Sequence, residues 1–227
     1  MAVRSPVSDV RDLTALLRTA PARAGRTRVI AIDGRSGSGK STLAALLHRD
    51  SGAPVVSLED LYGGWDGLEH GVDLLVSEVL LPLAAGRVAY VPRYDWVNAC
   101  WRTPAELPPP ATLIVEGVGA GARRAAGHAS VLVWLEVEER TRRRRALDRD
   151  GDVYAPHWER WAAQEAALLA RERTWERADI ILRTEDGAVP EPDADGPDGG
   201  GPDGGGPDGG GPDGGEADGE RRVSGSG

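Results

Sequence analysis

The segment Gly34-Arg35-Ser36-Gly37-Ser38-Gly39-Lys40-Ser41 fits the pattern G-x-x-x-x-G-K-[ST]. An apolar run at residues 28–33 precedes it, and Leu43, Leu46 and Leu47 follow with helical spacing. A strand, a glycine-rich turn and a helix in this order predict a loop that holds phosphates with its backbone N–H groups and with the helix N-terminus. Glycine permits the backbone angles that let consecutive N–H groups point at one ligand.

Each part of this phosphate loop has an expected role. Lys40 can reach the β- and γ-phosphates and stabilise their charge during transfer, and the Ser41 hydroxyl can bind Mg²⁺. The sequence therefore predicts ATP and Mg²⁺ as bound groups. We expect the phosphates to contact Gly34, Ser36, Gly37, Ser38, Gly39, Lys40, Ser41 and Thr42.

Strand-like and helix-like patterns alternate along the first 187 residues. Apolar strand patterns occur at 28–33, 54–58, 112–116, 131–135 and 178–182, and helical patterns at 74–85, 138–149 and 156–175. A short extended piece is expected at 88–91, and an N-terminal helix capped by Ser8. This alternation predicts an α/β fold of the P-loop NTPase type, like that of nucleoside and nucleotide kinases. We expect a five-stranded parallel sheet with helices on both faces, and a helical lid at about 138–157.

The last forty residues have a different composition. Residues 196–215 are four copies of Gly-Pro-Asp-Gly-Gly, and residues 188–227 hold most of the chain's net charge of −9. Glycine, proline and aspartate offer no apolar surface to offset the entropy of ordering. We therefore predict a kinase domain over 1–187 and a disordered acidic tail over 188–227.

The remaining composition bounds the partners and the compartment. The part before the tail is nearly neutral, so we expect neither nucleic acid nor a membrane as a partner, but a small-molecule acceptor. The single cysteine, Cys100, permits no internal disulfide. The N-terminus lacks the apolar stretch of a signal peptide, and the longest apolar segment is too short to span a bilayer. These features favour a cytoplasmic location.

Three acidic residues lie near the expected phosphate site. Asp60 follows the second strand, where a carboxylate can take the proton of an attacking hydroxyl or simply cap a helix. Glu116 ends an apolar strand and can act on Mg²⁺ directly or through water, or be a solvated strand-end acid. Asp33 precedes Gly34 and can buttress the loop.

Several of these segments together resemble the uridine kinase/phosphoribulokinase-like family of P-loop kinases, over most of residues 26–183. Residues 33–44 match the opening motif of that family, and Val115-Glu116-Gly117 resembles its Glu-Gly element. Glu59-Asp60-Leu61-Tyr62 resembles its Asp-x-Phe-Tyr element, which implies Asp60 as the catalytic base and Tyr62 on the acceptor side. Pro92-Arg93-Tyr94-Asp95-Trp96 resembles the segment that lines the acceptor pocket, which implies acceptor contacts by Tyr62, Arg93, Tyr94, Asp95 and Trp96. Ala99 stands where uridine kinases place a histidine that contacts the base.

Arginines are concentrated in the segment that resembles the lid of the family. Arg142, Arg145 and Arg149 share one helical face, from which guanidinium groups can clamp phosphates. We expect Arg142 and Arg145 to act in catalysis and Arg149 to bind the nucleotide. The alternative is a solvated basic face paired with neighbouring acids.

The sequence thus favours an ATP-dependent kinase that phosphorylates a hydroxyl of a nucleoside-like or sugar-like acceptor. Two alternatives remain open. One is a CMP-like nucleoside monophosphate kinase, in which Arg93 would meet the acceptor phosphate. The other is a nucleotide-binding regulatory module with slow or no turnover. Trp65, Trp96 and Trp101 should border the acceptor pocket, as stacking surfaces or as packing residues.

Overall fold

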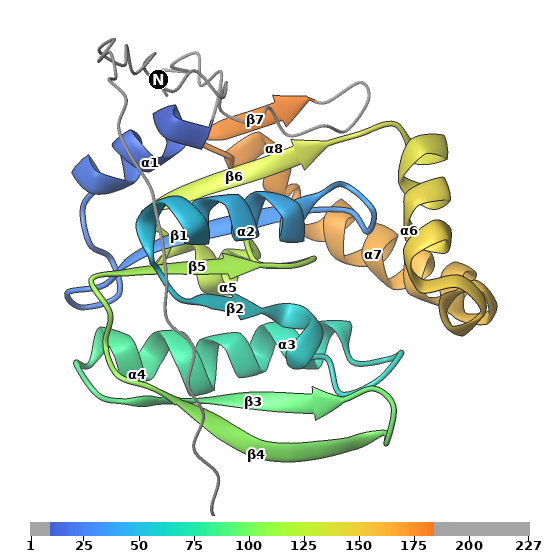
Figure 1. The fold of residues 1–227 in the computed structure, drawn as a ribbon, viewed down its shortest axis with the longest axis horizontal. Coiled ribbons are helices and arrows are strands. Elements are labelled where there is room, and N and C mark those ends of the chain that lie inside the picture. The colour runs from blue at the N-terminus through green and yellow to red at the C-terminus, as the bar shows by residue number, and fades with distance from the viewer. Residues whose placement is uncertain (1–9, 184–227) are drawn as a thin grey trace, which may run out of the picture. The chain divides into compact units, whose positions relative to one another are not determined.

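The computed structural model describes residues 10–183, apart from some side chains of its first helix and of its lid helix (Figure 1). Ser8, the predicted helix cap, and the predicted tail at 188–227 lie outside the described residues. All described residues belong to one compact unit. None of the helices within 10–183 has the length and apolarity that a membrane span requires.

The five predicted strands form one parallel sheet. In sheet order they are β2 (Val55–Ser57), β5 (Thr112–Glu116), β1 (Arg28–Gly34), β6 (Val131–Glu136) and β7 (Ile180–Arg183). Ile30 of β1 pairs with Ile114 of β5 on one side and with Val131 of β6 on the other. The central strands are apolar throughout because helices cover both faces of the sheet.

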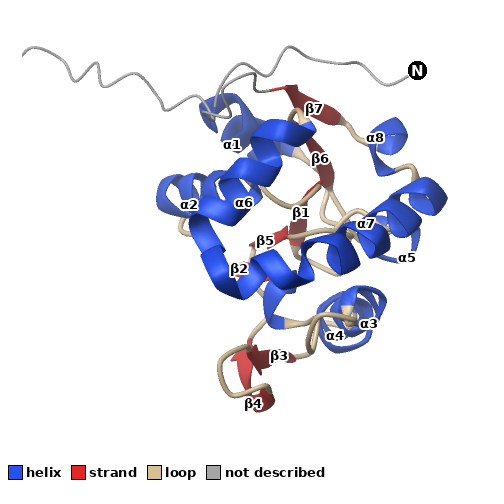
Figure 2. Ribbon diagram, turned by 90° about the vertical axis from the view of Figure 1, so that its right-hand side faces the viewer, coloured by secondary structure: helices blue, strands red, loops and turns tan. Residues whose placement is uncertain are grey.

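Successive residues of β1 face opposite layers of the core, as the period of a strand requires. Ile30 and Ile32 pack with Leu43 and Leu47 of α2 (Lys40–Ser51) and with Leu13 of α1 (Val10–Thr19). Val29 and Ala31 belong to the cluster on the other face, beneath α5 (Arg123–Ala126) and α7 (Trp158–Glu172). Figure 2 shows α1 and α2 on one side of the strands and α5, α7 and α8 (Thr174–Arg177) on the other.

The helix expected at 74–85 begins earlier than predicted. It runs from α3 (Leu68–Leu74) through a π-helical segment (Leu75–Leu80) into α4 (Leu81–Ala84). The π-helical segment comes just before Pro82, which has no backbone N–H and interrupts the α-helical ladder. The signal for this earlier start is present in the sequence, because Leu68, Val72, Leu75 and Val79, all fully buried, share one helical face at i, i+4, i+7 and i+11.

The short extended piece expected at 88–91 is instead one arm of an antiparallel hairpin. Strands β3 (Ala89–Asp95) and β4 (Cys100–Leu107) form a separate two-stranded sheet, at the bottom of Figure 1. Strand β4 was not predicted, because it is exposed up to Leu107 and contains Pro104. The hairpin carries the segment expected to line the acceptor pocket.

The predicted lid helix and the helix predicted after it are present with shifted ends. Helix α6 (Glu139–Tyr154) is followed by a 3-10 turn (Ala155–His157) and by α7. Helix α7 ends at Arg173, whose φ of 48° is left-handed, and the short α8 leads into β7. This places α6 and α7 beside the end of β1 from which the phosphate loop leaves (Figure 1).

Candidate active site

The phosphate loop connects β1 to α2 as predicted. Gly39 precedes α2 with a φ of 93° and has no side chain to cap the helix, so the first N–H groups of α2 are free of a side-chain cap. The Lys40 ammonium is nearly buried and donates to the carbonyl oxygen of Arg35, 3.1 Å away across the loop. A free helix N-terminus beside an ammonium group suits the phosphates of a nucleotide. Ser38 is buried within the loop, and Ser41 and Thr42 are exposed at the start of α2.

Asp33 fixes the start of the loop from below. Its carboxylate is fully buried and accepts from the N–H groups of Gly34 (2.7 Å), Gly119 (3.0 Å) and Gly121 (3.0 Å). Burial raises the pKa of Asp33, and the three N–H donors and the charge of Lys40 oppose that rise. The buttressing role expected for Asp33 therefore fits its place, which joins the phosphate loop to the segment after β5.

Glu116 and Ser41, the predicted magnesium ligands, lie together. Ser57 stands opposite Glu116 in the neighbouring strand, and its hydroxyl donates to Glu116 Oε1 at 2.6 Å. Burial raises the pKa of Glu116, while the charge of Lys40 and hydrogen bonds from Ser57 and Ser41 lower it. A carboxylate beside a hydroxyl offers the oxygen ligands that Mg²⁺ prefers, so these residues fit that ion.

The loop after β2 brings two acids to the same end of the sheet. It contains a 3-10 turn, Leu58–Asp60, which Ser57 caps by accepting from the N–H of Glu59 at 3.3 Å. Burial raises the pKa of the half-exposed Asp60, the charge of Arg93 lowers it, and Glu59 raises it further. Asp60 therefore lies near Arg93 of the hairpin, as the acceptor-site prediction requires.

Glu59 is a candidate that the sequence analysis missed. The charge of Glu59 raises the pKa of Glu116, so the Glu59 carboxylate acts electrostatically on this predicted magnesium ligand. The signal was available in the sequence, because counting back three residues from Tyr62, as the Asp-x-Phe-Tyr spacing demands, reaches Glu59 rather than Asp60. The structure thus offers two neighbouring carboxylates for the role assigned to Asp60.

The side chain of Tyr62 is buried. It is 2% exposed, its hydroxyl donates to the carbonyl oxygen of Val118 at 3.0 Å, and its ring packs edge-on against Trp161. Burial, with the nearby acids, raises the pKa of Tyr62 well above its usual value. In this structure Tyr62 ties the acidic loop to the segment after β5, and its predicted acceptor contact stays a prediction.

Four aromatic side chains form a cluster beside the acidic loop, which we call the aromatic cluster: Trp65, Tyr94, Trp96 and Trp101. Their rings meet edge-on at centroid distances of 5.0 Å (Trp65 and Trp96), 5.4 Å (Tyr94 and Trp96) and 5.2 Å (Tyr94 and Trp101). Trp96 also donates from Nε1 to the carbonyl oxygen of Glu59 at 2.9 Å. Since Trp96 and Trp101 remain partly exposed, the cluster presents aromatic surface next to the acids.

Asp95 is used within the hairpin. Its Oδ1 accepts from the N–H groups of Val97 and Asn98, both at 3.0 Å, and its Oδ2 accepts from the Asn98 amide and from Arg102. These donors hold the pKa of Asp95 well below its usual range. Both oxygens are occupied, so in this structure Asp95 shapes the hairpin turn, and its predicted acceptor contact stays a prediction.

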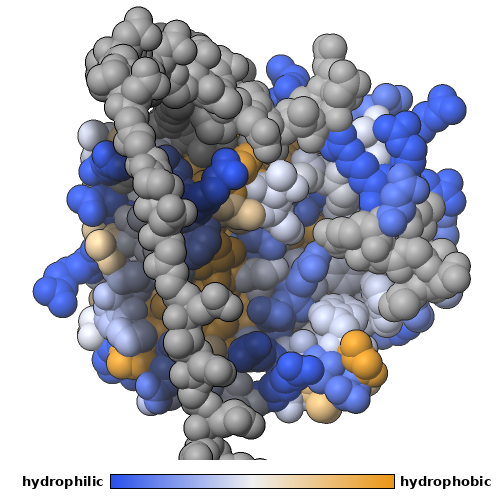
Figure 3. Space-filling model, viewed as in Figure 1, coloured by the Kyte–Doolittle hydropathy of each residue, from blue (hydrophilic) through white to orange (hydrophobic). Residues whose placement is uncertain are grey.

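The lid arginines are in different environments. Arg142 is 5% exposed and donates from Nε to the carbonyl oxygen of Val137 (3.0 Å) and from Nη1 to that of Ser36 (3.3 Å). Arg145 is half-buried, and the side chain of Arg149 lies outside the described part of α6. Hydrophilic side chains gather over α6 at the right of Figure 3. The Arg142 guanidinium thus contacts the backbone of the phosphate loop. The catalytic roles of the lid arginines stay predictions.

Comparison with known proteins gives the class of the fold. No family model matches the chain. A structure described as a candidate uridine kinase from Bacillus stearothermophilus has a TM-score of 0.53 and 20% identity, covering 76% of this chain and 96% of that one. One described as a candidate fructose transport system kinase from Silicibacter sp. TM1040 has a TM-score of 0.51 and 22% identity, covering 76% and 98%. The fold is therefore that of the P-loop kinases, in the uridine kinase-like form that the motifs resemble.

Sequence similarity to curated proteins is confined to a short stretch. Cytidylate kinases of Pseudomonas putida (strain W619) and Pseudomonas entomophila (strain L48) are each 48% identical to this chain over 59 residues. The match covers 25% of this chain and 26% of each relative, so the chain spans about a quarter of the length of the curated relatives it matches.

Proposed function

We propose that the protein is an ATP-dependent kinase that transfers the γ-phosphoryl group to a hydroxyl of a small nucleoside-like or sugar-like acceptor. The observation that carries the proposal is the meeting of three features at one end of the sheet. These are the phosphate loop with Lys40, the Ser41–Glu116 pair, and the acidic loop at 59–60 beside the aromatic cluster. In open parallel sheets ligands bind at this end of the strands.

The residues of this site have separate roles in the proposed reaction. Lys40 and the loop N–H groups hold the phosphates, and Ser41 and Glu116 hold Mg²⁺, which when bound neutralises charge on the phosphate oxygens. Asp60 orients the acceptor hydroxyl and takes its proton as the hydroxyl oxygen bonds to the γ-phosphorus and the bond to the leaving ADP oxygen breaks. Burial raises the pKa of Asp60, which makes it a stronger base than a fully solvated aspartate.

The acceptor is placed against the hairpin in this proposal. Tyr94 and Trp96 offer aromatic surface on which a planar ring or the apolar face of a sugar can lie. Arg93, near Asp60, can donate hydrogen bonds to a hydroxyl oxygen or an anionic group of the acceptor. Arg142 and its neighbours on α6 cover the transferring group and exclude water, which would otherwise compete as the nucleophile.

A second candidate is phosphorylation of a nucleoside monophosphate. It is supported by the place of Arg93 beside Asp60, where a guanidinium could pair with an acceptor phosphate, and by the 59-residue similarity to cytidylate kinases. In that case the acceptor oxygen is a phosphate oxygen, and no general base is needed to remove a proton from it.

An acceptor panel tests the proposal. ADP release from ATP·Mg²⁺ is measured with nucleosides, sugars and nucleoside monophosphates, each as the only acceptor. Phosphorylation of a nucleoside or a sugar supports the proposal, and a diphosphate product supports the second candidate. ATP binding without acceptor-dependent ADP release would contradict both and leave a regulatory nucleotide-binding module. Lys40→Ala, which removes the ammonium from the phosphates, should abolish transfer in either kinase.

A further inference from the structure

Ser36, the third residue of the phosphate loop, forms hydrogen bonds with the lid helix α6 and with α7, the helix after the lid. Its backbone N–H donates to Glu165 Oε1 of α7 at 2.9 Å, and its hydroxyl donates to the same oxygen. Its carbonyl oxygen accepts from Arg142 Nη1 of α6 at 3.3 Å. Glu165 lies 129 residues further along the chain than Ser36, so these hydrogen bonds join α7 to the phosphate loop.

The carboxylate of Glu165 is itself held in one orientation. The indole Nε1 of Trp161 donates to Glu165 Oε1 at 2.9 Å and contacts the Ser36 hydroxyl at 3.0 Å. Glu165 is 3% exposed and Trp161 is 5% exposed. A buried carboxylate is costly without donors, so three donors on a single oxygen fix where that oxygen lies. Burial lowers the pKa of the nearby Arg142 guanidinium, and the charge of Glu165 opposes that decrease.

Gly37, the next residue of the loop, is packed closely against the backbone at the start of α6. Gly37 has a φ of 78°, and a Cβ atom there would lie 2.2 Å from the carbonyl oxygen of Arg142. Residues 36 and 37 are therefore confined between the start of α6 and the oxygen of Glu165. The conformation of this part of the loop is set by its contacts with α6 and α7.

We propose that Glu165 is a positioning residue of the phosphate loop. By accepting the N–H and the hydroxyl of Ser36, its Oε1 fixes the turn at 36–37, so that the N–H groups of Gly37, Gly39, Lys40 and Ser41 converge on the phosphates of ATP. The N–H of Ser38 donates within the loop, to the carbonyl oxygen of Arg35 at 3.2 Å. This role also accounts for Ser36, whose N–H was expected to bind phosphate but is occupied by Glu165. The inference rests on the proposed ATP-binding function.

The test compares two substitutions of Glu165 by their effect on the Kd of ATP·Mg²⁺, measured by calorimetric titration of the full chain. Glu165→Ala removes the acceptor and should weaken ATP binding about tenfold, as expected for loss of a charge-assisted hydrogen bond. Glu165→Gln keeps an oxygen in the same place and should restore the Kd to within about threefold of the original protein. The acceptor oxygen, rather than the charge, is what positions Ser36.

Glu172→Ala is the matched control. Glu172 is a second buried glutamate of α7, two turns further on, and it accepts from the backbone N–H of Arg123 instead of from the loop. This variant should lose thermal stability while its ATP affinity stays unchanged. Should Glu165→Ala fail to fold, Trp161→Phe keeps an aromatic ring and removes the indole N–H that orients Glu165, and it must weaken ATP binding about threefold.

Two results would overturn the inference. ATP binding by Glu165→Ala that is as tight as in the original protein, or tighter, would mean that the carboxylate merely packs there or competes with phosphate. A Glu165→Gln variant as weak as Glu165→Ala would remove the acceptor oxygen from the role. If the unsubstituted protein itself binds no ATP, the proposed function fails, and this outcome is seen before any variant is compared.

Discussion

At the scale of single residues, Glu59 and Asp60 differ in their surroundings more than in their chemistry. Asp60 is near Arg93 of the hairpin, and the charge of Glu59 bears on Glu116 and Tyr62. Both side chains are exposed at the end of the sheet where the phosphate loop begins. A kinase needs one carboxylate at the acceptor hydroxyl, and the second can only tune the charge there.

The pair Asp60→Asn and Glu59→Gln separates these roles. If Asp60 is the base, Asp60→Asn should lower kcat about 100-fold or more, since general-base catalysis contributes about that much, and leave the KM of ATP nearly unchanged. Glu59→Gln should then change kcat only a few-fold. Steady-state ADP release with the acceptor found in the panel gives both constants, and the reverse ranking would assign the base to Glu59.

Glu116→Gln tests the predicted magnesium site and carries a stability signature. Loss of the carboxylate should weaken Mg²⁺-dependent ATP binding about tenfold or more. Because burial raises the pKa of Glu116, the charged carboxylate costs stability at neutral pH, and the glutamine variant should have the higher Tm there.

The sign of the pH dependence follows from the same shift. As the pH falls through the raised pKa of folded Glu116, the original protein takes up a proton and the cost of the buried charge disappears. The difference in Tm between the variant and the original protein should therefore shrink between neutral pH and pH about 4.5. Thermal melts at several pH values measure this difference, and a constant gap would contradict the account.

At the scale of elements, the β3–β4 hairpin supplies the acceptor side of the proposed site, and a hydrogen bond joins its tip to the acidic loop. Trp96 Nε1 donates to the carbonyl oxygen of Glu59 at 2.9 Å. Trp96→Phe keeps an aromatic ring and removes this bond. We expect the KM of the acceptor to rise about three- to tenfold while the Kd of ATP stays the same.

Trp101→Phe is the control for the hairpin, because Trp101 belongs to the same aromatic cluster and is 45% exposed. It should change the acceptor KM less than Trp96→Phe does. Equal effects of the two substitutions, measured in the same steady-state assay, would mean that the ring surface matters and the bond to the acidic loop does not.

Elements also show what the sequence could and could not predict. Strands β1, β5 and β6 were predictable because burial on both faces makes each of them a nearly continuous apolar run. The edge strands β2 and β7 are partly exposed and were predictable only from short apolar runs. Strand β4 was not, because it is exposed and has no alternating pattern. Motif similarity placed Arg93 and Trp96 beside the acids, yet it could not tell that Tyr62 points into the core or that Asp95 caps a turn. The role of Glu165 could not be predicted from the sequence, because its contact with Ser36 joins distant parts of the chain.

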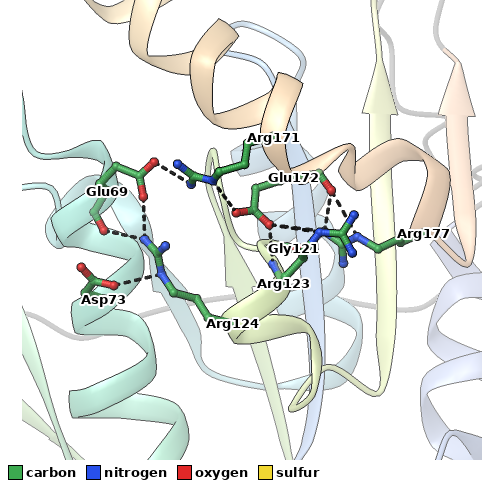
Figure 4. A network of polar contacts seen from close by, with 8 residues as sticks. All are labelled: Glu69, Asp73, Gly121, Arg123, Arg124, Arg171, Glu172 and Arg177. Carbon is green, nitrogen blue, oxygen red and sulfur yellow. Dashed lines mark hydrogen bonds and ion pairs between the residues drawn. The ribbon is translucent and has the colours of Figure 1, made fainter.

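At the scale of the whole described unit, an ion-pair network joins four helices behind the phosphate loop (Figure 4). Arg124 of α5 bridges Glu69 and Asp73 of α3, and Arg171 of α7 bridges Glu69 and Glu172. Glu172 also accepts from the N–H of Arg123 at 2.8 Å and lies 4.0 Å from Arg177 of α8. Arg177 in turn donates to the carbonyl oxygen of Gly121, whose N–H reaches Asp33 under the loop.

Glu172 should therefore matter for the stability of the whole unit. Its side chain is nearly buried, and Glu172→Ala leaves the Arg123 N–H without its acceptor and removes one of the two carboxylates that pair with Arg171. We expect a loss of about 1–3 kcal/mol in the free energy of unfolding at pH 7, measured by urea denaturation. Glu176→Gln, which breaks the exposed pair with Arg173, is the control and should cost less than about 1 kcal/mol.

The dependence of this loss on pH tests its electrostatic origin. Burial alone would raise the pKa of Glu172, but the hydrogen bond from Arg123 and the charges of Arg171 and Arg177 lower it below the usual 4.5. A lowered pKa in the folded state contributes stability that is complete above pH 4.5 and disappears as the pH falls through the folded value. The difference between Glu172→Ala and the original protein should thus be constant from pH 7 to about 5 and diminish below that. A difference that persists undiminished at pH about 3 would mean that Glu172 stabilises the helices by packing, and that its charge contributes little.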